Sequence, residues 1–189
     1  MFIEVDKNTE FVVKGGSKFY GAPDVTADFE WPYIVDEDDE FDLEFLCQLN
    51  CEDLAERCSF IKKKGMLYFF IDPLSEKWYP ENLDAVRVVY SNSDIKDLDY
   101  IDSIDQNGES IGYPELKIVF DPGVLLNTHN LIEIMTQNEK FVTLIKLNSE
   151  ILSYAGIELS EKCCLEVFTE EERVLKGDFS NVRVKVVSI

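Results

Sequence analysis

The chain has 189 residues, of which 46% are hydrophobic, and its 38 Asp and Glu against 18 Lys and Arg give a net charge of −20. A field of that sign repels phosphates and anionic headgroups, so the composition argues against direct binding to nucleic acid or to a membrane. A basic protein partner is compatible with it, and so is a role in solubility alone.

The first six residues lack the basic start and the long apolar run of a secretory signal, so we expect none here. The five cysteines are an odd number, and the adjacent Cys163 and Cys164 would point to opposite faces of a strand. We therefore expect all five to be reduced, which fits a cytoplasmic protein.

The first half of the chain opens with a Gly-Gly-Ser-Lys segment at 15–18, which lacks the spacing of a phosphate loop and is typical of a turn. Residues 35–44 contain seven acids and predict an exposed connection, although residues 41–45 alternate in the manner of a half-buried strand. Asn50 is a candidate N-cap of a short helix, and strands are predicted at 66–71 and 86–90.

The second half follows a further acidic connection at 92–109. The apolar spacing in 128–137 predicts a short amphipathic helix that carries Leu131, Ile132, Ile134 and Met135. A strand is then predicted at 141–147, a helix capped by Asn148 comes next, and strands follow at 164–168 and 182–187.

The two halves resemble each other in the same order of motifs. Residues 45–54 match 143–152 at five of ten positions with an offset of 98, and 66–70 align with 164–168 at the same offset. We predict an α+β, β-rich fold of two strand–helix–strand–strand units, packed as one compact domain with a few short helices. The expected boundaries are repeat 1 at about 11–92, an acidic linker at about 93–109, and repeat 2 at about 110–189 of a single domain, 1–189.

Several short motifs resemble the YwqG-like family of uncharacterised proteins: 15–23 followed by Trp-Pro, Phe-Leu-Cys-Gln-Leu-Asn at 45–50, 64–72, and 177–182. The resemblance implies a compact β-dominated fold with an internal duplication, and no established activity. Lys146 departs from the Gln typical of the family's second half, and 156–163 lack its Trp-Gly-Asp. The residues that carry the resemblance are Gly21, Pro23, Trp31, Pro32, Gln48, Gly65, Asp72, Asp178 and Phe179.

Motifs for catalysis are sparse. The one histidine, His129, lies near an expected helix start, and neither a Gly-x-Ser-x-Gly elbow nor a zinc motif is present. Residues 103–114 depart from a calcium loop at Ser103 and at Pro114. We therefore name no catalytic residue, no metal ligand and no cofactor, and we leave the oligomeric state open.

Two functional classes follow from this pattern. The favoured one is a non-catalytic interaction module whose acidic surface binds a basic protein, as inhibitor or immunity proteins do. The alternative is a hydrolase-type or metal-assisted enzyme that uses clustered carboxylates in a cleft. The candidate residues for partner binding are the acids of the 35–44 segment: Asp36, Glu37, Asp38, Asp39, Glu40, Asp42 and Glu44.

Overall fold

The computed structural model describes residues 2–6, 12–36, 39–55, 58, 61, 64–72, 85–100, 115–120, 132–138, 140–154 and 156–188. His129, the 103–114 segment, and the acids Glu37 and Asp38 lie outside these ranges.

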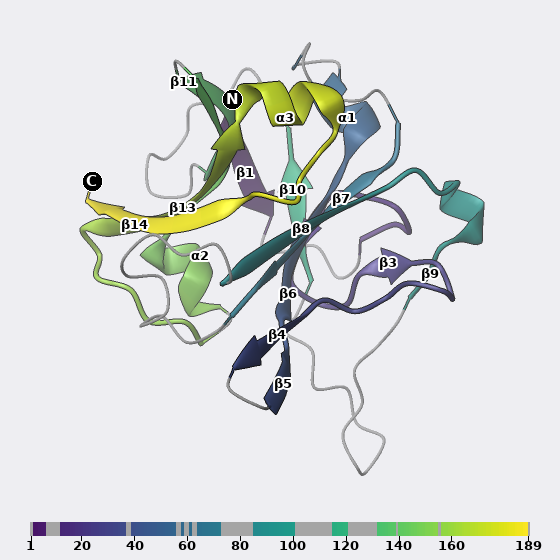
Figure 1. The fold of residues 1–189 in the computed structure, drawn as a ribbon, viewed down its shortest axis with the longest axis horizontal. Coiled ribbons are helices and arrows are strands. Elements are labelled where there is room, and N and C mark those ends of the chain that lie inside the picture. Colours follow the sequence, from purple (N-terminus) through teal and green to yellow (C-terminus); the bar gives the residue numbers. More distant parts are fainter. Residues whose placement is uncertain are drawn as a thin grey trace.

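One antiparallel sheet of ten strands contains most of the described chain (Figure 1). In spatial order its strands are β14 (Arg183–Ser188), β13 (Cys163–Glu170), β12 (Phe141–Asn148), β11 (Ile132–Asn138), β1 (Phe2–Asp6), β10 (Leu116–Val119), β2 (Lys18–Phe19), β6 (Glu44–Asn50), β7 (Met66–Ile71) and β8 (Val86–Ser91). Strand β1 pairs with β10 on one side and β11 on the other, and so joins the two halves of the sheet.

Smaller elements surround this sheet. Two short two-stranded sheets are formed by β3 (Asp24–Val25) with β9 (Asp99–Tyr100) and by β4 (Tyr33–Asp36) with β5 (Asp39–Asp42). The helices in the described ranges are α1 (Cys51–Ala55), α2 (Ser149–Ser153), α3 (Glu171–Lys176) and the 3₁₀ turn η2 (Ile95–Asp97). The predicted fold class, a compact β-rich α+β domain with a few short helices, is confirmed.

The units β6–α1–β7–β8 and β12–α2–β13–β14 share the order strand, helix, strand, strand and the register of their first strand pair, and the second unit carries the further helix α3 between β13 and β14. Asn50 lies opposite Met66 in the first unit, and Asn148 lies opposite Cys164 in the second. The register shifts between Phe45 and Cys47 in β6, and between the corresponding Thr143 and Ile145 in β12. An internal duplication would produce matching elements of this kind, and the duplication itself stays a prediction.

Two hydrophobic cores lie on opposite faces of the first unit, and β7 contributes to both. Its Leu67, Phe69 and Ile71 belong to a large inner core that also contains residues of the second unit, such as Leu147 and Leu165. Its Met66, Tyr68 and Phe70 belong to a smaller outer core with Val25, Ile34, Leu43, Phe45 and Leu98. The alternation along the strand explains why all six β7 residues are buried.

Two predictions of local structure need correction. The acidic 35–44 segment is exposed at 35 and 40–42, as predicted, but 35–36 and 39–42 belong to the paired strands β4 and β5 and are not a simple connection. The half-buried strand predicted at 41–45 is confirmed in part, since 41–42 end β5 and 44–45 begin β6.

The helix predicted at 128–137 is wrong where the chain is described, since 132–138 is strand β11, paired with β1 and β12. Pairing on both sides outweighs the local helical spacing, and β-branched residues favour a strand.

Both helix caps are confirmed. The Asn50 side chain accepts a hydrogen bond from the Glu52 amide at 2.8 Å, and the Asn148 side chain accepts one from the Ile151 amide at 3.0 Å. All five cysteines are free thiols, and burial raises the pKa of the Cys47 thiol well above its ordinary value. None of the helices in the described ranges is long and apolar enough to cross a membrane.

A tyrosine hydroxyl links the two units through the inner core. The Tyr20 side chain is 1% exposed, and its hydroxyl donates to the Ile151 carbonyl at 2.6 Å. We expect Tyr20→Phe to lower the free energy of unfolding by about 1–2 kcal/mol, because the buried carbonyl loses its donor. Denaturant titration measures the change, with Tyr154→Phe at an exposed position as the control. Equal stability of the two variants would show that this hydrogen bond does not couple the units.

Candidate functional site

The motif residues of the first half meet in a buried polar cluster centred on Gln48, which is fully buried. The Gln48 amide nitrogen donates to the Gly16 carbonyl and to the Asp24 carboxylate, each at 2.8 Å, and its oxygen accepts from the Asp24 amide at 2.8 Å. The Asp24 carboxylate also accepts from the Gly15 amide at 2.8 Å. Strand β6 thereby holds the glycine turn and the start of β3 in fixed positions.

A buried lysine extends this cluster. Lys18 is 1% exposed, and its ammonium group lies 2.5 Å from the Glu115 carboxylate and 3.5 Å from the Asp24 carboxylate. Gly21 has φ of +72°, and a Cβ there would overlap the Glu115 side chain, so only glycine suits this position. The charged groups are hydrogen-bonded to one another, as buried ions must be, and the cluster therefore has a structural role.

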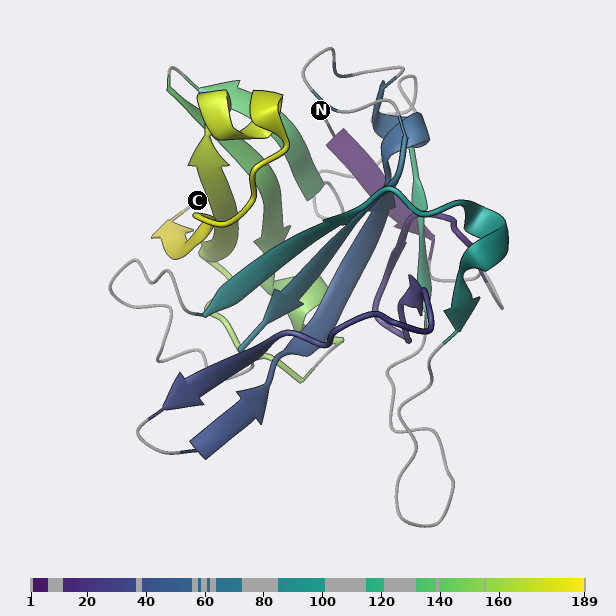
Figure 2. The ribbon, with the colours of Figure 1, turned by 45° about the vertical axis from the view of Figure 1, so that its right-hand side comes forward.

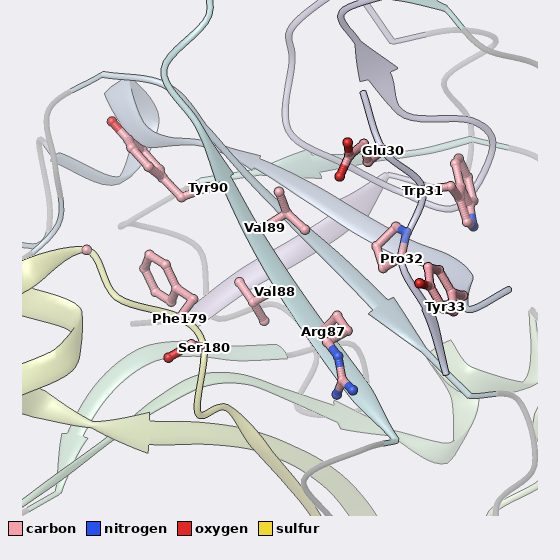
Figure 3. Close-up of a pocket in the computed structure, with 11 residues that line it drawn as sticks. Glu30, Trp31, Pro32, Tyr33, Arg87, Val88, Val89, Tyr90, Phe179 and Ser180 are labelled. Carbon is pink, nitrogen blue, oxygen red and sulfur yellow. The ribbon is translucent and has the colours of Figure 1, made fainter. Parts of the chain in front are cut away.

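A groove of about 500 Å³ opens on the other side of the first unit, along strand β8 (Figure 3). The view shows β8 crossing the middle, with Phe179 and Ser180 on one side of it and Glu30, Pro32 and Tyr33 on the other. The groove thus joins three segments that are far apart in the sequence: 30–33, 87–90 and 177–180.

The first wall of the groove is tied to the start of β6. The Trp31 indole N–H donates to the Leu43 carbonyl at 2.8 Å, and the Leu43 amide donates back to the Pro32 carbonyl at 3.0 Å. The Trp31 ring also packs edge-on against Phe70, with their centroids 5.0 Å apart. This wall is therefore preformed.

The second wall is the turn between α3 and β14. The Asp178 carboxylate accepts from the Ser180 amide at 3.0 Å, from the Ser180 hydroxyl at 2.7 Å and from Arg173 at 2.7 Å. The bonds from Ser180 are the main reason that the pKa of Asp178 lies below its ordinary value, and Arg173 adds to the effect. The turn presents Phe179, which packs against the inner core and lines the groove.

The lining of the groove is mainly apolar. Aromatic and aliphatic side chains dominate the lining, and among these residues Glu30 supplies the one carboxylate and Arg87 the one cation. Within the described ranges, no three His, Cys, Asp or Glu side chains converge in a way that could hold a metal ion.

The predicted motif residues fall into three places. Trp31, Pro32 and Phe179 line the groove, and Asp178 holds the turn that presents Phe179. Gln48 belongs to the polar cluster, with Gly21 beside it and Pro23 buried nearby. Gly65 and Asp72 flank β7, and Gly65 has φ of +97° where a Cβ would overlap the Ser91 carbonyl.

The acidic candidates that the structure describes lie on two elements, the β4–β5 hairpin and the start of β6. Glu40 and Asp42 are exposed on β5, and the backbones of Asp36 and Asp39 belong to the same hairpin. Glu44 is different, because it begins β6 and is half-buried. Sequence reasoning missed Tyr33, Arg87 and Tyr90 as groove residues, since no local pattern links 33 to 87–90.

Comparison with known families places the chain. It belongs to DUF1963, a domain of unknown function, whose family model matches residues 17–185. The match covers both walls of the groove, strand β8, and the polar cluster except Gly15 and Gly16. No curated protein matches the chain.

The position of Glu44 generates a pH-dependent prediction. Burial, and then the nearby Asp72 carboxylate, raise the pKa of Glu44 above its ordinary value. A carboxyl whose pKa is higher in the folded state destabilises that state when it is ionised, so the cost exists at neutral pH and disappears as the pH falls below the unfolded value, about 4.3. We expect Glu44→Gln to stabilise the protein at pH 7 by less than about 1 kcal/mol after solvent screening.

Denaturant titration at pH 7 and at pH 4 measures this effect. The gap between Glu44→Gln and the parent should close at the lower pH. The control is Glu158→Gln, which removes the same charge at an exposed position. A gap that is constant with pH, or that widens toward pH 4, would contradict the assigned direction.

Proposed function

We propose that this protein is a non-catalytic interaction module that binds a basic protein partner through its acidic surface, as inhibitor and immunity proteins do. The observation that supports it most is the β4–β5 hairpin, which extends beyond the body of the fold (Figure 2). It exposes 50% of Tyr33, 63% of Val35 and 50% of Phe41. Large apolar side chains gathered among charges on a projecting element are typical of an interface.

The hairpin combines apolar contacts and negative charge on one face. Val35 lies opposite Glu40, and Tyr33 lies opposite Asp42, so these two exposed apolar side chains each have a carboxylate as cross-strand neighbour, whereas Phe41 lies opposite the buried Ile34. A partner that brings Lys or Arg together with apolar groups would satisfy both. The net charge of −20 would also speed its encounter with this surface.

The carboxylate-enzyme alternative has weaker support. Glu44 and Asp72 are a carboxylate pair whose interaction contributes to the raised pKa of Glu44. Neither residue is among those lining the groove of Figure 3, which is built mainly of apolar side chains. The structure therefore favours binding. We further propose a cytoplasmic location and a place among the YwqG-like proteins as a short acidic member.

The test is comparative capture. The immobilised chain is exposed to a lysate of its source cells, and retained proteins are identified by mass spectrometry. We expect a basic protein that is released by high salt. Glu40→Gln with Asp42→Asn should slow its association by about threefold or more at low salt, because two steering charges are lost.

The matched control is Glu158→Gln with Glu161→Gln, which removes the same number of charges at exposed positions outside the hairpin. Its association rate should stay close to that of the parent. If both double variants slow association equally, the effect comes from the net charge and not from the hairpin. Retention of the same proteins at unchanged rates by the hairpin variant would refute a partner surface on β4–β5.

A further inference from the structure

Strand β8 has an unusual place in the fold. Among the described residues it is the last strand of the ten-stranded sheet, next to β7. Both of its faces are covered: Val88 belongs to the inner core, while Val89 packs against the outer core. A terminal strand is a ready template for pairing with another chain, and natural proteins commonly shield it. In this fold, the layers that cover the two faces of β8 form the borders of a groove.

The lining of the groove shows that it follows the strand edge. Four successive β8 residues, Arg87 to Tyr90, line it. Successive side chains of a strand point to opposite faces, so a hollow over a single face would contact only alternate residues. A hollow that contacts all four runs beside the strand, in the plane of the sheet.

We propose that this groove receives an extended segment of the partner, which adds to the sheet as a further strand along β8. The inference rests on the proposed function and specifies how the partner is held. Strand addition uses main-chain hydrogen bonds for affinity and alternate side chains for specificity. Between the two walls, the partner side chains that point to one face of the sheet would meet a different environment from those that point to the other face.

The two environments differ in chemistry. One set of partner side chains would face Val88, Tyr90 and Phe179, which form an apolar and aromatic wall. The other set would face the Glu30–Tyr33 wall, which continues into the hairpin that carries Glu40 and Asp42. On that side there are three exposed carboxylates and one cation: Glu30, Glu40 and Asp42, with Arg87. The fitting segment therefore alternates apolar residues with Lys or Arg.

Charge also argues against a second copy of this chain as the occupant. Two copies would each bring a net charge of −20 to the contact, and like charges oppose association. A basic segment gains from the same field. Both walls are preformed, through Trp31 with Leu43 and through the Asp178 turn, so little ordering is needed before the segment binds.

The experiment uses the full chain and synthetic peptides of about eight residues, long enough to match one strand. One peptide alternates Val and Lys, and a second has the same composition with the Val and Lys in separate blocks. We expect the alternating peptide to bind about tenfold or more tightly than the block peptide by calorimetry. N-methylation of one alternate set of its amides should reduce affinity about tenfold, and methylation of the other set should not.

A variant of the protein tests the place of binding. Ser180 is exposed and lines the second wall, so Ser180→Trp places a bulky ring at the border of the groove; the backbone amide that bonds Asp178 is kept, while the bond from the hydroxyl at 2.7 Å is lost. Ser160→Trp, at another exposed loop position, is the control. We expect about a tenfold loss of affinity for the alternating peptide with Ser180→Trp only, and thermal unfolding verifies that both variants fold.

Three results would overturn strand addition: equal affinity for the alternating and block peptides, equal effects of the two methylated sets, or unchanged binding by Ser180→Trp. A dimer in sedimentation that Ser180→Trp dissociates would instead assign the groove to a second copy. Failure here is distinguishable from failure of the proposed function. A whole basic partner whose association depends on Glu40 and Asp42 but not on Ser180 would leave the proposed function standing.

Discussion

The fully buried Gln48 amide is the constraint on which the other features depend. A buried amide must have its donors and acceptor satisfied, and here the partners are the glycine turn and Asp24. These bonds dock the 15–24 segment against β6 and set where the chain leaves for the outer layer. The buried Lys18, paired with Glu115, holds the same segment to β10. An apolar residue at 48 would leave buried polar groups of two segments without partners, which costs more than the hydrogen bonds contribute.

The groove and the hairpin are consequences of that docking. Once Asp24 is fixed, residues 25–34 cross the outer face of the first unit and pack Val25, Phe29 and Ile34 on Tyr68 and Phe70. The chain then leaves the body as the hairpin and returns at Leu43, which is bonded to Trp31 and Pro32. One wall of the groove is therefore the end of the outer layer. The other wall belongs to the second unit, which the inner core holds in place. Some motif residues, such as Gln48 and Gly21, thus hold these segments in place, and others, such as Trp31 and Phe179, line the groove that results.

The sequence predicted what depends on local pattern. Alternation and apolar runs located β7, β8, β12, β13 and β14, and the two asparagine caps located α1 and α2. The β11 strand was missed because its helical spacing is a local signal, while its pairing with β1 and β12 is a distant one. The first strand of the acidic hairpin was missed because its composition is typical of a loop, while its pairing with β5 and the burial of Ile34 depend on the rest of the fold. The groove could not be predicted, since it needs the relative placement of 30–33, 87–90 and 177–180.

We propose that the protein engages a partner strand at the edge of β8, between the two walls. Amide hydrogen exchange, measured with and without a saturating peptide of alternating Val and Lys, tests this most directly. Strand pairing protects amides on the shared edge, so exchange should slow in β8 and in both flanking walls, 30–33 and 177–180. Protection confined to the β4–β5 hairpin, or found on parts of the fold remote from β8, with exchange in β8 unchanged, would contradict the account.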